Sequence, residues 1–311
     1  MITRRTLLVG TAAVAGTVAF GGTAQAACGP DLELRANAKL AVTVRSRSAW
    51  GADESYRFKN GAEVWRPEFF KLQAVTVHHV GYDDGNDPLA TLRSVYKDQA
   101  VTQGFGDIGY HLLIDWTGAV YEGRYSGGDC VPVLNPGKAA ANSGNAAVDW
   151  GRAVNPGMAG VSPGAGRAAG NLGKTVDPDM AAGNLGKTVD PGKAAVDPGR
   201  AAVDPGKGAV NAGHVNQWNA GNVGVCLLHN LSHVKPTQAA LDSLARTVAT
   251  LCAVGGLDPV GMVDYVNPVN KKTRTVPAVS GHRDWAETEC PGNLMYPLVP
   301  DVRQKAKALI G

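Results

Sequence analysis

The hydrophobic residues of this chain form short runs whose spacing predicts strands and helices in turn. Residues 72–77, Leu-Gln-Ala-Val-Thr-Val, are mostly apolar and are typical of a buried strand that ends at the pair His78-His79. Asp87 and Pro88 then provide a cap and a first helical residue for a helix with one apolar face. A strand followed by a helix favours an α/β arrangement.

A second pair of strands is predicted around a tight turn at residues 115–118. The first strand spans Ile108 to Asp115, and the returning strand spans Ala119 to Arg124. Side chains alternate between the two faces of a strand, so Tyr110 and His111 should point in opposite directions. Only one of these two residues can therefore face a common site.

The C-terminal part again alternates between strand and helix patterns. A strand is predicted at residues 221–230, and a helix that begins at Pro236-Thr237 and ends at Gly255-Gly256 follows it. The apolar stripe of this helix is a core face. Residues 264–276 are predicted to form a polar loop, residues 276–280 a short strand, and the segment from about Pro300 a terminal helix.

Residues 132–210 differ in composition from the rest of the chain and contain internal repeats. Ala-Ala-Gly-Asn-Leu-Gly-Lys-Thr-Val-Asp-Pro occurs at 168–178 and again at 181–191, and Val-Asp-Pro-Gly begins at 189, 196 and 203. These units lack the large apolar residues with which stacked repeats bury a core. The composition therefore predicts a disordered, low-complexity Gly/Ala/Pro-rich insert.

The N-terminus has the order of a cleavable secretory signal. Arg4-Arg5 precedes the apolar stretch 7–20, which is too short to span a bilayer, and Ala24-Gln-Ala26 follows it. The paired arginines resemble a twin-arginine export signal, so we expect cleavage after Ala26 and a secreted protein. A lipoprotein signal that ends at Cys28 is the alternative. Residues 27–45 lead into the folded part.

Charge and cysteine content narrow the function classes. A net charge of +3 is too small to indicate nucleic-acid binding, but it is compatible with an anionic cell-wall surface. Export permits disulfides. If Cys290 binds a metal, as argued below, the other four cysteines can form two disulfides in three ways. Cys226 and Cys252 could equally be free buried thiols. Those four are Cys28, Cys130, Cys226 and Cys252.

The stretch from Gly281 to Gly292 contains candidate metal ligands, because His282 precedes Cys290 by eight residues. Zinc binds imidazole nitrogen and thiolate sulfur, and a catalytic zinc has three protein ligands and an open position. The pair His78-His79 at the end of the first strand is the best source of the third ligand. Adjacent strand residues face opposite ways, so only one of the two should bind.

Several motifs in this order resemble the family of peptidoglycan recognition proteins and type 2 amidases. The motifs are Thr76-Val-His-His79, Asp107-Ile-Gly-Tyr-His111, Tyr121-Glu-Gly-Arg124, Gly213-His214 through Gly221-Asn-Val-Gly-Val225, Gly281-His-Arg-Asp284 and Cys290-Pro-Gly292. The resemblance implies a central mixed β-sheet flanked by helices, formed by residues 46–131 and 211–311 and interrupted by the insert. It also implies a zinc-dependent N-acetylmuramoyl-L-alanine amidase that acts on peptidoglycan.

The resemblance also implies individual roles. His78, the first of the histidine pair, would bind zinc together with His282 and Cys290. Tyr110 would be catalytic and His111 a neighbour with satisfied hydrogen bonds, while Thr288 would be an auxiliary donor. Tyr121, His214 and Asn219 would line the groove for the muramyl peptide.

Three other functions compete with this interpretation. Cys290 and His282 could form a cysteine hydrolase pair, but the third histidine fits a metal better and no serine nucleophile elbow is present. A non-catalytic peptidoglycan-binding module is the main alternative, and the complete ligand set with Tyr110 argues against it. A cell-surface structural protein would require the insert to bind a partner by itself. We expect a monomer without a membrane span.

Overall fold

The computed structural model describes residues 28–81, 87–128, 130–134 and 208–311. The predicted signal peptide and nearly all of the predicted insert lie outside these residues. Within the described part, no helix is long and apolar enough to cross a membrane.

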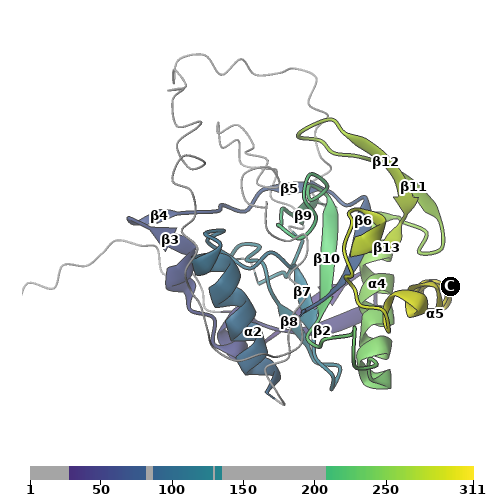
Figure 1. Ribbon diagram of the computed structural model, residues 1–311, viewed down its shortest axis with the longest axis horizontal. Helices are drawn as coiled ribbons and strands as arrows, with labels where there is room; N and C mark the ends of the chain where they lie inside the picture. Colours follow the sequence, from purple (N-terminus) through teal and green to yellow (C-terminus); the bar gives the residue numbers. More distant parts are fainter. Residues whose placement is uncertain (1–27, 82–86, 129, 135–207) are drawn as a thin grey trace, which may run out of the picture.

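The centre of the fold is a seven-stranded mixed sheet with the order β1-β2-β8-β7-β10-β6-β13 (Figure 1). β10 pairs in parallel with both β6 and β7, and β13 pairs in parallel with the other edge of β6. β1 with β2 and β7 with β8 are antiparallel, so the sheet is mixed as expected. Its strands are β1 (Asp31–Arg35), β2 (Ala41–Arg45), β6 (Ala74–His79), β7 (Leu112–Ile114), β8 (Val120–Glu122), β10 (Asn222–Leu227) and β13 (Val279–Gly281).

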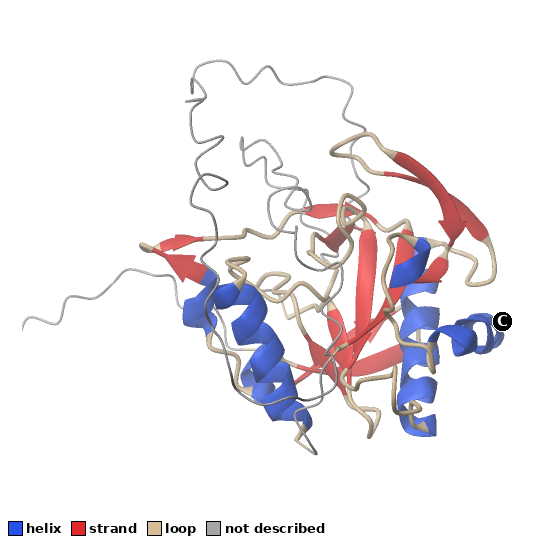
Figure 2. Ribbon diagram, viewed as in Figure 1, coloured by secondary structure: helices blue, strands red, loops and turns tan. Residues whose placement is uncertain are grey.

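Helices cover both faces of this sheet (Figure 2). α4 (Gln238–Gly255) and α5 (Val299–Ile310) pack on one face through the larger core cluster, which includes Val75, Val77 and Val225. α2 (Pro88–Lys97) packs on the other face with Leu113, Tyr121 and Cys226. The remaining helical turns are α1 (Arg47–Trp50), η1 (Glu54–Arg57), η2 (Asp98–Thr102), η4 (His282–Asp284) and η5 (Tyr296–Leu298).

The predicted helix ends are confirmed by their caps. The side chain of Asp87 accepts hydrogen bonds from two N–H groups at the start of α2. Thr237 caps α4 in the same way, and Gly256, with φ of 66°, ends that helix in the left-handed conformation.

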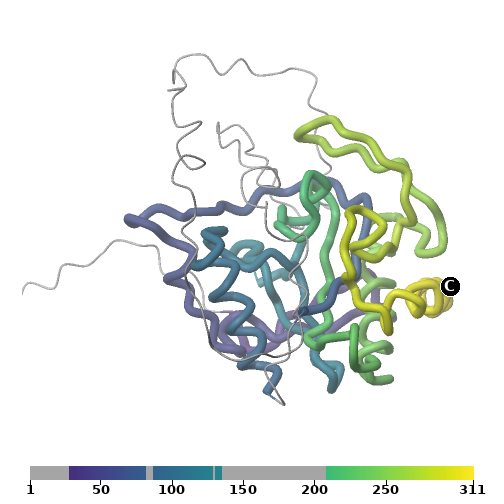
Figure 3. Tube along the Cα trace, in the orientation of Figure 1, coloured from purple at the N-terminus to yellow at the C-terminus, as the bar shows by residue number. Residues whose placement is uncertain are grey.

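The loop predicted at residues 264–276 is wrong, because most of it forms a hairpin of β11 (Met262–Val266) and β12 (Thr273–Pro277). The hairpin projects from the main sheet (Figure 3). Only Tyr265 of β11 is fully buried, where it contacts Trp218 and Trp285. The two strands are exposed along most of their length, so their sequence resembles that of a polar loop. Two further short ladders pair β3 (Phe58–Lys59) with β4 (Ala62–Glu63) and β5 (Phe69–Lys71) with β9 (Gly208–Val210).

Both ends of the segment predicted as an insert are buried in the fold. Val133 and Leu134 belong to the main core, and Leu134 pairs with Ala209 of β9 in an antiparallel bridge. Val210 N donates to Val133 O at 2.8 Å. The chain therefore leaves and re-enters the described domain at adjacent points.

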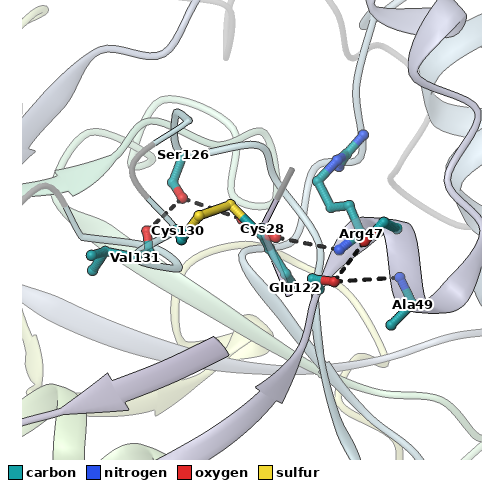
Figure 4. The surroundings of a disulfide bond; sticks show 9 residues. Cys28, Arg47, Ala49, Glu122, Ser126, Cys130 and Val131 are labelled. Carbon is teal, nitrogen blue, oxygen red and sulfur yellow. Dashed lines mark hydrogen bonds between the residues drawn. A yellow bond between two sulfur atoms is a disulfide. The ribbon is translucent and has the colours of Figure 1, made fainter. Parts of the chain in front are cut away.

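One disulfide closes the N-terminal part of the domain. Cys28 is bonded to Cys130, and the bond lies beside the buried carboxyl group of Glu122 (Figure 4). Cys226 and Cys252 are free and buried. The structure therefore selects one of the possible pairings for two cysteines and leaves the other two as core thiols.

Candidate metal centre

The sheet brings three potential metal ligands together on the α2 face. His78, near the end of β6, lies beside Cys226 of β10 in the parallel ladder. β13 runs next to β6 on the other side, and His282 follows directly after β13. The ligand atoms of His78, His282 and Cys290 all lie within 4.8 Å of one another.

Backbone contacts fix the sulfur of Cys290 in this cluster. His79 N–H donates to Cys290 Sγ at 3.4 Å, so this backbone group can stabilise a thiolate. Cys290 N–H donates to Thr288 Oγ1 at 3.2 Å, and Arg283 N–H donates to Cys290 O at 3.1 Å. Thr288 thus shapes the loop that presents the thiol.

The three groups are strongly desolvated. Burial lowers the pKa of His78 well below its usual range and that of His282 to about 4, so both imidazoles are neutral at physiological pH. Burial raises the pKa of the Cys290 thiol to about 12. A neutral imidazole is ready to bind a metal, whereas the thiol must lose its proton on binding.

The distance between His78 and Cys290 fits a tetrahedral zinc ion. Typical Zn–S and Zn–N bonds of about 2.3 Å and about 2.05 Å at a tetrahedral angle separate the sulfur and nitrogen by about 3.6 Å. His78 Nδ1 lies 3.6 Å from Cys290 Sγ. The donor set of two imidazoles and one thiolate also suits zinc and leaves a fourth position open.

Tyr110 lies next to the cluster. Its ring centroid is 5.2 Å from that of His78, and its hydroxyl contacts the Cys226 thiol. The strand predicted at residues 108–115 is shorter in the structure, because β7 contains only residues 112–114. Gly123 allows this part of the chain to approach closely, since a Cβ there would lie 2.3 Å from Tyr110 O.

His111 is not part of the three-ligand cluster, and both of its ring nitrogens are hydrogen-bonded. Its Nε2 donates to Val210 O at 2.7 Å, and its Nδ1 accepts from Gly224 N–H at 2.9 Å. This arrangement matches the satisfied neighbour expected from the sequence.

The three residues expected to bind substrate lie in different surroundings. His214 is buried against His78, with 2.9 Å between His78 Nε2 and His214 Nδ1. The side-chain oxygen of Asn219 accepts from the N–H groups of His214 and Val215, so it shapes the same loop. Tyr121 is buried in the α2-side core, where its hydroxyl donates to Asp115 at 2.8 Å. These contacts give all three a structural role.

Sequence reasoning missed the residues that support His78 from behind. The backbone carbonyl of Asn222 accepts from His214 Nε2 at 2.9 Å. Gly224 makes room for the His214 ring, because a Cβ at this position would lie 2.6 Å from the ring. An isolated glycine within a strand pattern signals such close approach, and Gly224 offered that signal.

A protein-family model described as N-acetylmuramoyl-L-alanine amidase matches residues 167–293. The match includes His214, His282 and Cys290. Over these residues the chain is similar to the N-acetylmuramoyl-L-alanine amidase family. His78 and Tyr110 lie outside the matched range, but the fold brings His78 beside His282 and Cys290, which lie inside it, and Tyr110 lies beside His78.

Solved structures similar to this chain include both recognition proteins and amidases. Drosophila peptidoglycan recognition protein SD is 17% identical, with 82% of this chain and 90% of that chain covered and a TM-score of 0.43. The amidase LysC from Clostridium intestinale URNW is 14% identical, with 79% and 93% covered and a TM-score of 0.40. No curated protein matches the sequence.

Proposed function

We propose that this chain is a zinc-dependent N-acetylmuramoyl-L-alanine amidase, which hydrolyses the amide between the muramoyl lactate and L-alanine of peptidoglycan. The observation that carries the proposal is the cluster of His78, His282 and Cys290, in which the separation of His78 Nδ1 and Cys290 Sγ suits zinc. The ligands come from three segments that the sheet aligns. The match to the amidase family model supports peptidoglycan as the substrate class.

A zinc ion held by these three residues would supply a Lewis acid for the scissile carbonyl and lower the pKa of a water molecule. His79 N–H, which donates to the sulfur of Cys290, would favour the thiolate form. Tyr110 lies beside His78 and would donate a hydrogen bond to the developing oxyanion or relay a proton. Thr288, which accepts from Cys290 N–H, would keep the ligand loop in place.

The location of the activity follows from the same proposal. A peptidoglycan amidase must reach the cell wall, and the N-terminal segment has the pattern of an export signal. The Cys28–Cys130 disulfide agrees with folding in an oxidising compartment. We therefore propose a secreted, cell-wall-associated enzyme.

Hydrolysis and mere recognition can be separated with one substrate preparation. The full chain is incubated with purified sacculi, and the new L-alanine amino groups and the protein retained on the pellet are both measured. An amidase releases amino groups in proportion to time. Retention on the pellet without any release would instead establish the non-catalytic recognition module.

The matched control is a cysteine variant outside the cluster. Cys252→Ser alters a buried free thiol of α4 on the opposite face of the sheet and should still release amino groups. Cys290→Ser should release none. If the two variants release amino groups equally, hydrolysis does not depend on the metal cluster and the proposal is contradicted.

A further inference from the structure

A chain of hydrogen bonds runs from the backbone of β10 to His78. The carbonyl oxygen of Asn222 can only accept, so His214 Nε2, 2.9 Å away, must carry a proton and donate. In the neutral ring, Nδ1 then accepts from His78 Nε2 at 2.9 Å. His78 in turn has its proton on Nε2 and a lone pair on Nδ1, the atom 3.6 Å from Cys290 Sγ.

The fold reserves space for this chain of hydrogen bonds. The His214 ring lies against Gly224, which stands between Asn222 and Cys226 in β10. A Cβ at Gly224 would come within 2.6–2.8 Å of three ring atoms, so any side chain there would displace the ring. Gly224 N–H is itself held by His111 Nδ1 at 2.9 Å.

The loop that contains His214 is held from two sides. Asn219 Oδ1 accepts from the backbone N–H groups of His214 and Val215 at 2.9 Å and 2.7 Å. The Gln217 carbonyl accepts from the side-chain amides of Asn267 and Asn270, in the turn of the β11–β12 hairpin. These contacts hold the ring where it meets both Asn222 and His78.

We propose that His214 is a positioning residue: it locks His78 in the tautomer with the proton on Nε2, so that Nδ1 faces the metal. The direction of the hydrogen bonds is set by the backbone carbonyl of Asn222, which can only accept. This inference rests on the proposed zinc site. It adds a residue that hydrogen-bonds to the ring nitrogen of His78 that does not face the metal, and hydrogen-bond partners of this kind commonly orient metal-binding histidines. We assign this role to His214 in place of the expected contact with substrate, because both of its ring nitrogens already form hydrogen bonds within the protein.

The first test is the tautomer itself. The full chain, labelled with ¹⁵N-histidine and stripped of metal with a chelator, is studied by long-range ¹H–¹⁵N NMR. His78 should show a protonated Nε2 and an unprotonated Nδ1. A His78 ring with its proton on Nδ1 in the wild-type chain would overturn the proposal, and this measurement depends on no variant.

The second test measures zinc affinity by competition with a chromogenic chelator. His214→Phe retains a ring of similar size but removes the acceptor, and it should weaken zinc binding by about 10–100-fold. His214→Gln retains an acceptor and a donor and should restore part of that loss. Gly224→Ala should behave like His214→Phe, whereas His233→Ala, an exposed histidine, should bind as the wild type does.

Unchanged zinc affinity in folded His214→Phe would overturn the proposal, as would equal losses in the Phe and Gln variants. If His214→Phe does not fold, the wild-type tautomer decides the question. These results can be distinguished from failure of the amidase proposal. If the wild-type chain cleaves no peptidoglycan but shows the expected tautomer and zinc affinities, the positioning role of His214 holds and the amidase activity is contradicted. If the wild-type chain cleaves peptidoglycan but His214→Phe leaves the zinc affinity unchanged, the amidase activity holds and the positioning role of His214 is contradicted.

Discussion

The Nδ1 atom of His78 and the Sγ atom of Cys290 lie 3.6 Å apart although 212 residues separate them in the sequence. This spacing is what two ligands of one tetrahedral zinc ion require. The approach depends on parallel pairing of β13 with β6, because this pairing places the loop after β13 beside the end of β6.

Tyr110→Phe should retain zinc but lower the turnover number by about 10–1000-fold, since one positioned donor or proton relay contributes that much. The change removes only the hydroxyl from a ring that packs beside His78. Zinc content and the initial rate of amino-group release check both halves of the prediction. Loss of zinc in this variant, or an unchanged rate, would contradict the assigned role.

Asp107→Asn should lower the free energy of unfolding by about 3–5 kcal/mol, because it breaks a fully buried ion network. Asp107 binds Arg47 at 3.0 Å and Arg124 at 2.6 Å, and both cations would lose their shared partner. Urea denaturation measures the change. Asp31→Asn, at an exposed pair with Arg45, is the matched control and should change stability by about 0–1 kcal/mol. Similar effects at the two sites would contradict the account.

Glu122→Gln should stabilise the protein at neutral and alkaline pH. Burial raises the pKa of Glu122 to about 7, above an unfolded value of about 4.3. A raised carboxyl pKa means that the stability contributed by the protonated group is present in acid and is lost as pH rises to about 7. The advantage of the Gln variant should therefore grow by on the order of 2 kcal/mol between about pH 5 and about pH 8.

Urea denaturation of both proteins at the two pH values measures this difference. The buried histidines are common to both proteins, so their titration cancels in the comparison. A difference that is constant with pH would show that Glu122 does not titrate as described.

Replacement of residues 135–207 by a short Gly/Ser linker should preserve folding and zinc binding. Leu134 and Ala209 are already paired, so a short connection can join the two ends, and closure entropy depends only weakly on loop length. Every candidate ligand lies outside the replaced segment. Circular dichroism and zinc content check the outcome. Because the family match begins at residue 167, aggregation or loss of zinc would show that this segment is part of the domain.

The sequence predicted the elements whose signals are local. Asp87, Thr237 and Gly256 mark helix ends by their own backbone chemistry, and the structure confirms them. The ligand set came from resemblance, and the structure brings its three residues together. The hairpin at 262–277 was not predicted because most of its residues are exposed, and only Tyr265 and Val276 are buried.

Contacts between distant segments could not be read from the sequence. The pairing of Cys28 with Cys130 was one of several possibilities until the fold brought the two thiols together. The hydrogen bond between His78 and His214 joins residues 136 positions apart, and it depends on the space left because Gly224 has no side chain. Periodicity places each of these residues on its own element but does not say which elements meet.

The central claim is that one zinc ion on His78, His282 and Cys290 makes the chain a peptidoglycan amidase. The most direct test is titration of the metal-free full chain with zinc while amino-group release from peptidoglycan is measured. The account predicts that activity rises to a plateau at about one zinc per chain, and that Cys290→Ser shows no rise at the same zinc concentrations. Full activity in the metal-free chain, or a normal rise in Cys290→Ser, would contradict it.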